Sequence, residues 1–272
     1  MKRLLALFGS ILVALIGLVA VAQPAAAADT AQVSVVHGIP GTPVNVFVNG
    51  KSTLPNFEPG TVAGPLDLPA GDYEITVFPA ADSKGTGTPV ISAKATVPGG
   101  ANVTLVAHLT ADGTPTLTPF VNDTSSIAAG EGRLVVRHTA AAPAVDVRAG
   151  GKVVFSDLTN PDEAKADLPA GTVSADVVLA GTDTVAIGPA DVKVTAGTET
   201  IVYAIGSAQD KTLGVVVQTI DGLAAAPGGV PAGTGGQAAA VGVPGWLAVL
   251  VGGGLLLALI GGFALRPTTA RR

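Results

Sequence analysis

The chain has 272 residues, a net charge of −5 and no cysteine. The absence of cysteine excludes disulfides, a thiol nucleophile and cysteine-ligated metals. All 20 acidic residues but only 10 of the 15 basic ones lie between Asp29 and Gly242, so this segment has a charge near −10 (10 minus 20), which argues against nucleic acid as a partner.

The first 28 residues have the features of a secretory signal peptide. Lys2 and Arg3 precede an apolar run at residues 4–22, and alanines occupy residues 25–28. A positive start, an apolar centre and an Ala-x-Ala site predict cleavage before Asp29 and export of the chain that follows.

The exported part shows an apolar pattern with a period of two residues. Apolar and polar residues alternate at residues 44–48, 73–77, 91–97 and 103–109, and clusters of Gly, Pro and Asp separate these runs. Short alternating runs between turn signals predict an all-β fold of antiparallel β-sandwich type. No stretch of the ectodomain keeps the apolar spacing of an amphipathic helix.

The same series occurs twice, at an offset near one hundred residues. The pentapeptide Asp-Leu-Pro-Ala-Gly occupies residues 67–71 and again 167–171, where we expect it to form a turn with Gly at positive φ. A period this long indicates tandem domains with separate cores.

We predict a first β-sandwich at residues 31–123, a linker at 124–131 and a second β-sandwich at 132–222. The period-two pattern leaves Ig-like and transthyretin-like connectivity both open.

Three histidines are present, and two of them, with one aspartate, are weak candidates for a site. His108 stands at even parity in a strand with apolar odd positions, so we expect it to face water. His37 and His138 occupy equivalent positions and share parity with core residues, so we expect them to face inward and hydrogen-bond a turn. Alternatively, Asp146 would orient His138 for acid–base work or metal ligation, although Asn45 replaces that aspartate in the first copy.

The sequence offers little for catalysis. One His with one Asp falls short of the three or four ligands of a zinc site. The chain has no Gly-x-Ser-x-Gly, His-Glu-x-x-His or Gly-x-x-x-x-Gly-Lys motif. We predict no enzyme, no cofactor and no metal, with His138, Asp146 and His37 as weak candidates for a site. A metal-assisted hydrolase centred on His138 and Asp146 is the least favoured alternative.

The Val-x-His sequence ending at His138, the following residues 142–147 and the Leu-Pro-Ala-Gly before a strand resemble the bacterial "domain of unknown function 4397" family. The resemblance covers both copies and is cleaner in the second, since Asn45 departs from the family's usual aspartate in the first. It implies exported β-sandwich modules, often in tandem and often in high-GC Gram-positive bacteria. It supplies no established activity and no catalytic residues.

A stalk and a membrane anchor are predicted after the second domain. Residues 223–243 are rich in Ala, Gly and Pro and predict a flexible stalk of about 25 Å average span. Residues 245–265 are apolar, and 21 residues of helix cover roughly 30 Å, one hydrocarbon core. The basic tail at 266–272 predicts a cytoplasmic C-terminus.

Small residues inside the predicted span fall at i, i+4 and i+8, namely Gly254, Ala258 and Gly262. This spacing lets two helices approach closely, which would permit a weak dimer. We favour the simpler explanation that the spacing reflects the Gly/Ala-rich composition of this segment.

We expect a single-pass protein of the bacterial cell membrane, with its ectodomain outside. The favoured function is a non-enzymatic interaction or scaffolding protein of the cell envelope that presents β edges to a protein partner. The alternative is a cell-wall glycan or polysaccharide binding module. Sugar sites on such folds use exposed aromatic faces, and the ectodomain has seven Phe and Tyr residues, most of them within apolar strands: Phe47, Phe57, Tyr73, Phe78, Phe120, Phe155 and Tyr203.

Overall fold

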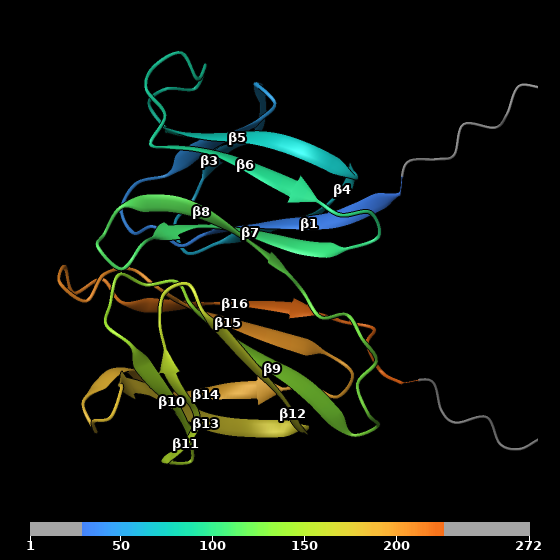
Figure 1. Ribbon diagram of the computed structural model, residues 1–272, viewed down its shortest axis with the longest axis vertical. Helices are drawn as coiled ribbons and strands as arrows, with labels where there is room; N and C mark the ends of the chain where they lie inside the picture. Colours follow the sequence, from blue (N-terminus) through green and yellow to red (C-terminus); the bar gives the residue numbers. More distant parts are fainter. Residues whose placement is uncertain (1–28, 226–272) are drawn as a thin grey trace, which may run out of the picture. The chain divides into compact units, whose positions relative to one another are not determined.

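Sixteen β-strands make up the part of the chain that the computed structural model describes, residues 29–225 (Figure 1). The predicted all-β fold class is confirmed. Within this range no helix is long and apolar enough to cross a membrane. The predicted signal peptide (1–28), most of the stalk (223–243), the apolar span (245–265) with its small residues, and the basic tail (266–272) lie outside the described residues.

The first eight strands form two four-stranded sheets, in the orders β4-β1-β7-β8 and β3-β2-β5-β6. The bounds of these strands are β1 Thr30–His37, β2 Val44–Val48, β3 Lys51–Phe57, β4 Val62–Pro69, β5 Gly71–Pro79, β6 Ile91–Val97, β7 Asn102–Leu109 and β8 Pro115–Val121.

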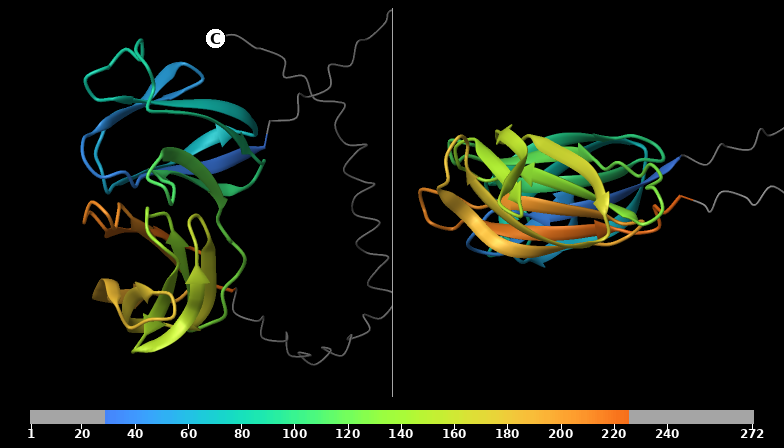
Figure 2. Two further views of the ribbon diagram at one scale, coloured as in Figure 1. Left: turned by 60° about the vertical axis from the view of Figure 1, so that its left-hand side comes forward. Right: turned by 90° about the horizontal axis from the view of Figure 1, so that it is seen from below.

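The next eight strands repeat this topology, in the orders β12-β9-β15-β16 and β11-β10-β13-β14. Their bounds are β9 Glu131–His138, β10 Val145–Ala149, β11 Lys152–Leu158, β12 Glu163–Pro169, β13 Gly171–Leu179, β14 Val185–Val194, β15 Glu199–Ile205 and β16 Gly214–Ile220. Adding eight to each strand number of the first sandwich gives the second, so the sequence repeat is also a repeat of topology. The two layers of each sandwich can be followed in Figure 2.

The sheets are mixed, and the prediction of purely antiparallel pairing was wrong. β1 pairs in parallel with β7, and β9 pairs in parallel with β15. The reason is that the chain visits the opposite sheet between these strands, and such crossovers permit parallel neighbours that a hairpin cannot join.

The strand order decides between the two connectivities left open by the sequence. In an Ig-like sandwich strands 1, 2, 5 and 4 share one sheet and strands 3, 6 and 7 form the other. Here β1 and β2 lie in different sheets, as do β9 and β10. This excludes the Ig-like order and leaves the transthyretin-like alternative.

The repeated pentapeptide carries the chain from one sheet to the other. β4 ends at Pro69 and β5 begins at Gly71, and β12 and β13 meet in the same way at Pro169 and Gly171. Gly71 has a φ of 154°, but Gly171 has no positive φ. The expected positive φ is therefore found in the first copy only.

Each sandwich has its own apolar core, and a third apolar cluster lies between the two sandwiches within one compact unit. The members of this third cluster are Val36, Val106 and Phe120 from the first sandwich and Val135, Ile201, Tyr203, Ile205 and Val216 from the second. The central strands β7 and β9 are consequently buried on both faces. We call this contact the inter-sandwich interface.

Candidate functional site

His138 and Asp146 form no hydrogen bond with each other. The Nε2 of His138 lies 3.0 Å from the carbonyl oxygen of Pro143, and its Nδ1 lies 3.4 Å from the amide nitrogen of Ala140. A carbonyl only accepts and an amide only donates, so this geometry fits a neutral ring with its proton on Nε2. Both ring nitrogens are therefore engaged by the backbone, and neither is free to hydrogen-bond the carboxylate of Asp146.

Asp146 instead anchors the backbone of two neighbouring segments. Its carboxylate accepts the amide protons of Asp157 at 2.8 Å and of Gly181 at 2.9 Å. These two hydrogen bonds lower the pKa of Asp146. Asp157 has a φ of 56° and lies where the pairing of β10 with β11 shifts register, so the carboxylate holds a local irregularity in the edge strand β11.

Asn45 anchors the backbone in the same way in the first sandwich. Its Oδ1 accepts the amide proton of Asn56 at 2.9 Å, and Asn56 has a φ of 49°. Its Nδ2 donates to the carbonyl oxygens of Pro79, Ala80 and Asp82 at 3.1 to 3.3 Å. The loop after β5 thus presents acceptors to Asn45, whereas the loop after β13 presents a donor to Asp146.

His37 lies inside the first sandwich without hydrogen bonds to either ring nitrogen in the described part of the chain. The ring is 1% exposed, and its centroid lies 5.7 Å from that of Phe57. Burial lowers the pKa of His37, against smaller opposing effects of the Thr42 backbone and the Glu58 carboxylate. The two equivalent histidines therefore have different surroundings, one hydrogen-bonded and one not.

His108 is buried, and the expectation that it faces water was wrong. The ring is 1% exposed, with Nε2 2.8 Å from the Oγ1 of Thr118 and Nδ1 2.9 Å from the carbonyl oxygen of Leu109. His108 does lie on the face of β7 that points away from its own core, as its parity in the strand predicts. That face is covered by the second sandwich, whose Asn160 donates to the same Leu109 carbonyl at 2.8 Å.

Burial also lowers the pKa of His108 and His138, so all three rings stay neutral near pH 7. Among residues 29–225 no group of three or more His, Cys, Asp or Glu side chains is arranged to hold a metal ion.

The inter-sandwich interface contains a polar network that the sequence reasoning missed. Arg137 is 1% exposed and donates to Glu163 at 2.8 Å, to the Tyr203 hydroxyl at 2.8 Å and to the Oδ1 of Asn122 at 2.9 Å. Its guanidinium also stacks over the ring of Phe120, with the Cζ atom 4.4 Å from the ring centroid. Every donor nitrogen is thus engaged, and the network is structural.

Gln218 on β16 links the network back to the first sandwich. Its Oε1 accepts from the Tyr203 hydroxyl at 2.7 Å and from the Thr104 hydroxyl at 3.1 Å. A charged side chain within an otherwise apolar strand, as in residues 134–138, was the signal that could have revealed the interface.

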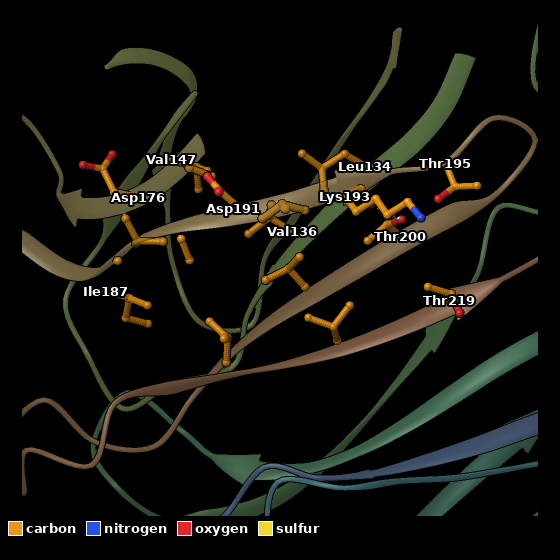
Figure 3. Close-up of a pocket in the computed structure, with 18 residues that line it drawn as sticks. Leu134, Val136, Val147, Asp176, Ile187, Asp191, Lys193, Thr195, Thr200 and Thr219 are labelled. Carbon is orange, nitrogen blue, oxygen red and sulfur yellow. Dashed lines mark hydrogen bonds between the residues drawn. The ribbon is translucent and has the colours of Figure 1, made fainter. Parts of the chain in front are cut away.

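The second sandwich has an apolar cleft between its two sheets (Figure 3). The cleft has a volume of about 360 Å³ and lies between the inner faces of β13 and β14 and those of β9, β15 and β16. Its inner walls include Leu134, Val136, Val147, Val177 and Val202. No aromatic side chain is among the residues that line it.

Charged residues border the cleft at its rim. Figure 3 shows Asp176 and Asp191 toward one end and Lys193, Thr195 and Thr219 toward the other. Val192 packs into the core of the second sandwich, so Asp191 and Lys193 on either side of it lie on the opposite face of β14. Asp176 is engaged by Arg148 at 2.6 Å. Asp191 and Lys193 are exposed and form no ion pair within residues 29–225.

The inner side of β16 faces this cleft. Val215, Val217 and Thr219 line it, and the two valines are 45% and 51% exposed. The alternate residues Val216 and Gln218 point to the inter-sandwich interface instead. β16 is thus anchored on one face and open on the other.

β16 differs from the other strands at the edges of the described sheets. Four sheets have two edge strands each, namely β4, β8, β3, β6, β12, β16, β11 and β14. Seven of them contain a proline, a charged residue or both, which are the usual protections against pairing with another chain. β16, with the sequence Gly-Val-Val-Val-Gln-Thr-Ile, contains neither.

Comparisons with known proteins support the family and leave the activity open. The model of the family "Domain of unknown function (DUF4397)" matches residues 31–148, which covers the first sandwich and extends into β10. No curated protein matches the chain.

One similar solved structure is described as "Crystal structure of CBMbc (family CBM26) from Eubacterium rectale Amy13K in Complex with Maltoheptaose". It is 12% identical, covers 73% of this chain and 98% of its own, and superposes with a TM-score of 0.24. A superposition this poor carries no argument about fold or ligand.

Proposed function

We propose that this protein is a non-enzymatic interaction module of the bacterial cell envelope, tethered to the outer face of the membrane, and that it binds an extended polypeptide by strand addition to β16. Export, the stalk and the single C-terminal anchor are proposed from the sequence at residues 1–28, 223–243 and 245–265.

The single observation that carries the binding mode is the unprotected edge of β16 beside an apolar cleft. An edge strand presents a row of unpaired amide and carbonyl groups, which another extended chain can satisfy. The packing of Val216 and Gln218 against the first sandwich holds this edge in place. A partner therefore meets a preformed edge, which lowers the entropy cost of binding.

The surroundings of the weak candidate residues favour a binding role over chemistry. His138 and Asp146 each have backbone hydrogen-bond partners, and His37 is enclosed beside Phe57. The glycan alternative lacks a specific observation in its favour, because the cleft offers no aromatic face for a sugar ring to stack on.

Site-specific photocrosslinking in cells that express the full chain tests the proposal. A photoreactive amino acid at Val217 should yield a discrete adduct with one partner. The same amino acid at Val121, a valine that is 60% exposed on the proline-containing edge strand β8, should not. Adducts of equal yield and identity from both positions would contradict binding at β16.

A further inference from the structure

The two edges that border the cleft of the second sandwich are unequal. β14 carries Pro189, Asp191 and Lys193, which protect it against strand addition. β16 carries none of these residue types. An added strand can therefore extend only the sheet of β16, and its inward side chains then lie over the open mouth of the cleft.

Strand geometry decides which side chains of a partner enter. Successive side chains of a strand point to opposite faces of the sheet. In a strand paired with β16, every second side chain lies on the face that carries Val215 and Val217 and points toward the cleft. The cleft is apolar apart from its ends, so a charge at these inward positions would be buried without a partner, at a large cost.

The charged residues of β14 do not enter the cleft. Val192 packs into the core of the second sandwich, so Asp191 and Lys193 on either side of it lie on the opposite face of β14. The cleft therefore selects the inward side chains of a partner by their apolar character.

From this geometry we infer the chemistry of the partner, an inference that rests on the proposed strand addition. The partner presents an extended segment of about seven residues, uncharged in its centre, with aliphatic β-branched side chains at alternate positions that fill the cleft. A small apolar molecule would fill the cleft but would leave the backbone edge unpaired, so we favour the polypeptide.

A synthetic peptide provides the probe. The sequence Glu-Thr-Val-Thr-Val-Thr-Val-Thr-Lys, blocked at both ends and labelled with a fluorophore, is titrated with the full chain in lipid nanodiscs, and fluorescence polarisation reports binding. Nanodiscs avoid free detergent, which would compete for an apolar cleft. We expect saturable binding that Val217→Lys weakens by at least about tenfold, because a cation replaces an aliphatic wall of the cleft. The matched Val121→Lys variant on β8 should bind like the parent.

Two altered peptides separate the inference from the proposed function. Glutamate at the three valine positions should weaken binding by at least about tenfold. N-methylation of alternate amides should abolish binding if the backbone pairs with β16.

If the valine and glutamate peptides bind equally but the N-methylated peptide does not, strand addition stands and the inferred side-chain chemistry is overturned. If an N-methylated peptide binds as well as its parent, the strand-addition proposal itself fails.

Discussion

Asn45 and Asp146 occupy equivalent positions in the two sandwiches and hold equivalent backbone amides, that of Asn56 at 2.9 Å and that of Asp157 at 2.8 Å. Both held residues have positive φ. The two side chains differ in their second contact, because Asn45 donates to carbonyl groups and Asp146 accepts from the amide of Gly181. Each residue type thus matches the loop that it faces, which gives the aspartate a structural role.

Exchanging the two residue types tests this role. Asn45→Asp places a carboxylate against the carbonyl oxygens of Pro79, Ala80 and Asp82, and it should lower the free energy of unfolding by about 1–3 kcal/mol. Asp146→Asn should also destabilise, since one oxygen acceptor is replaced by a donor. Urea unfolding followed by circular dichroism measures both. If neither variant loses stability, the structural role assigned to the two residues is contradicted.

The equivalent histidines should respond differently to replacement by phenylalanine. His37→Phe removes two buried nitrogens that have no partner in the described structure, so we expect unchanged or increased stability. His138→Phe leaves the carbonyl of Pro143 and the amide of Ala140 unpaired, and we expect a loss of about 1–3 kcal/mol. Thermal unfolding of the two variants decides, and equal losses would contradict the difference in their surroundings.

The pH dependence of stability follows from the lowered pKa values of the histidines. Burial places the folded-state pKa of His37, His108 and His138 below the unfolded value of about 6.5. Below pH 6.5 the unfolded chain therefore binds more protons than the folded chain, and stability falls as pH falls. Urea unfolding at pH 7 and pH 5.5 should show this loss, and His37→Phe should reduce it.

The sequence predicted the repeat and the all-β class because both depend on local patterns. Alternation reports which residues share a face of a strand, and it placed His108 on the correct face of β7. It cannot report what covers that face, because the cover comes from residues distant in the sequence, such as Asn160, which lies 51 positions from its partner Leu109. The uninterrupted apolar run at residues 201–205 was the available signal of a strand buried on both faces.

The candidate site needed the tertiary structure. That β16 lacks proline and charge is visible in the sequence, but its place at an edge depends on the strand order. The first sandwich has the same topology, yet its cavity is lined by other elements, including Lys51 and Ser52 of β3 and Leu66 and Leu68 of β4. The distance between the two sheets of a sandwich at each edge depends on the side chains that pack between them there. No local sequence pattern predicts that distance, and so none predicts the cleft.

Glu199 should weaken the fold when it is ionised. The side chain is 1% exposed, neither oxygen has a hydrogen-bond partner within residues 29–225, and burial raises its pKa despite Arg137 and Arg133 nearby. The charge of the Asp123 carboxylate raises the pKa of Glu199 further, whereas the backbone of Asp123 lowers it. As pH rises from the unfolded pKa of about 4.3 to the higher folded pKa, the unfolded chain loses its proton first, so the stability contributed by this group falls.

Glu199→Gln removes this titration. We expect the variant to gain stability relative to the parent as pH rises from 4 toward 8, because only the parent carries a buried charge at the higher pH. Urea unfolding at pH 4, 6 and 8 measures the difference. A difference that does not depend on pH would show that Glu199 is not buried as described.

Arg137 should be the side chain whose loss most weakens the inter-sandwich interface. Arg137→Met keeps the buried stem but leaves the Oδ1 of Asn122 without its donor and removes a partner of the Tyr203 hydroxyl, so we expect a loss of about 2–4 kcal/mol. Arg137→Lys should recover little of this loss, because an ammonium group cannot reproduce the planar fork. In calorimetry, we expect the two sandwiches of the Met variant to unfold in separate transitions.

Lys165→Met is the matched control for Arg137→Met. Lys165 pairs with Asp123 at 2.6 Å, but its side chain is 50% exposed, so its removal should cost about 0–1 kcal/mol and leave the transitions coupled. Equal effects of the two substitutions would mean that charge alone matters at this contact. A larger effect of Arg137→Met is expected because the guanidinium is buried, stacked on Phe120 and hydrogen-bonded at each of its three nitrogens.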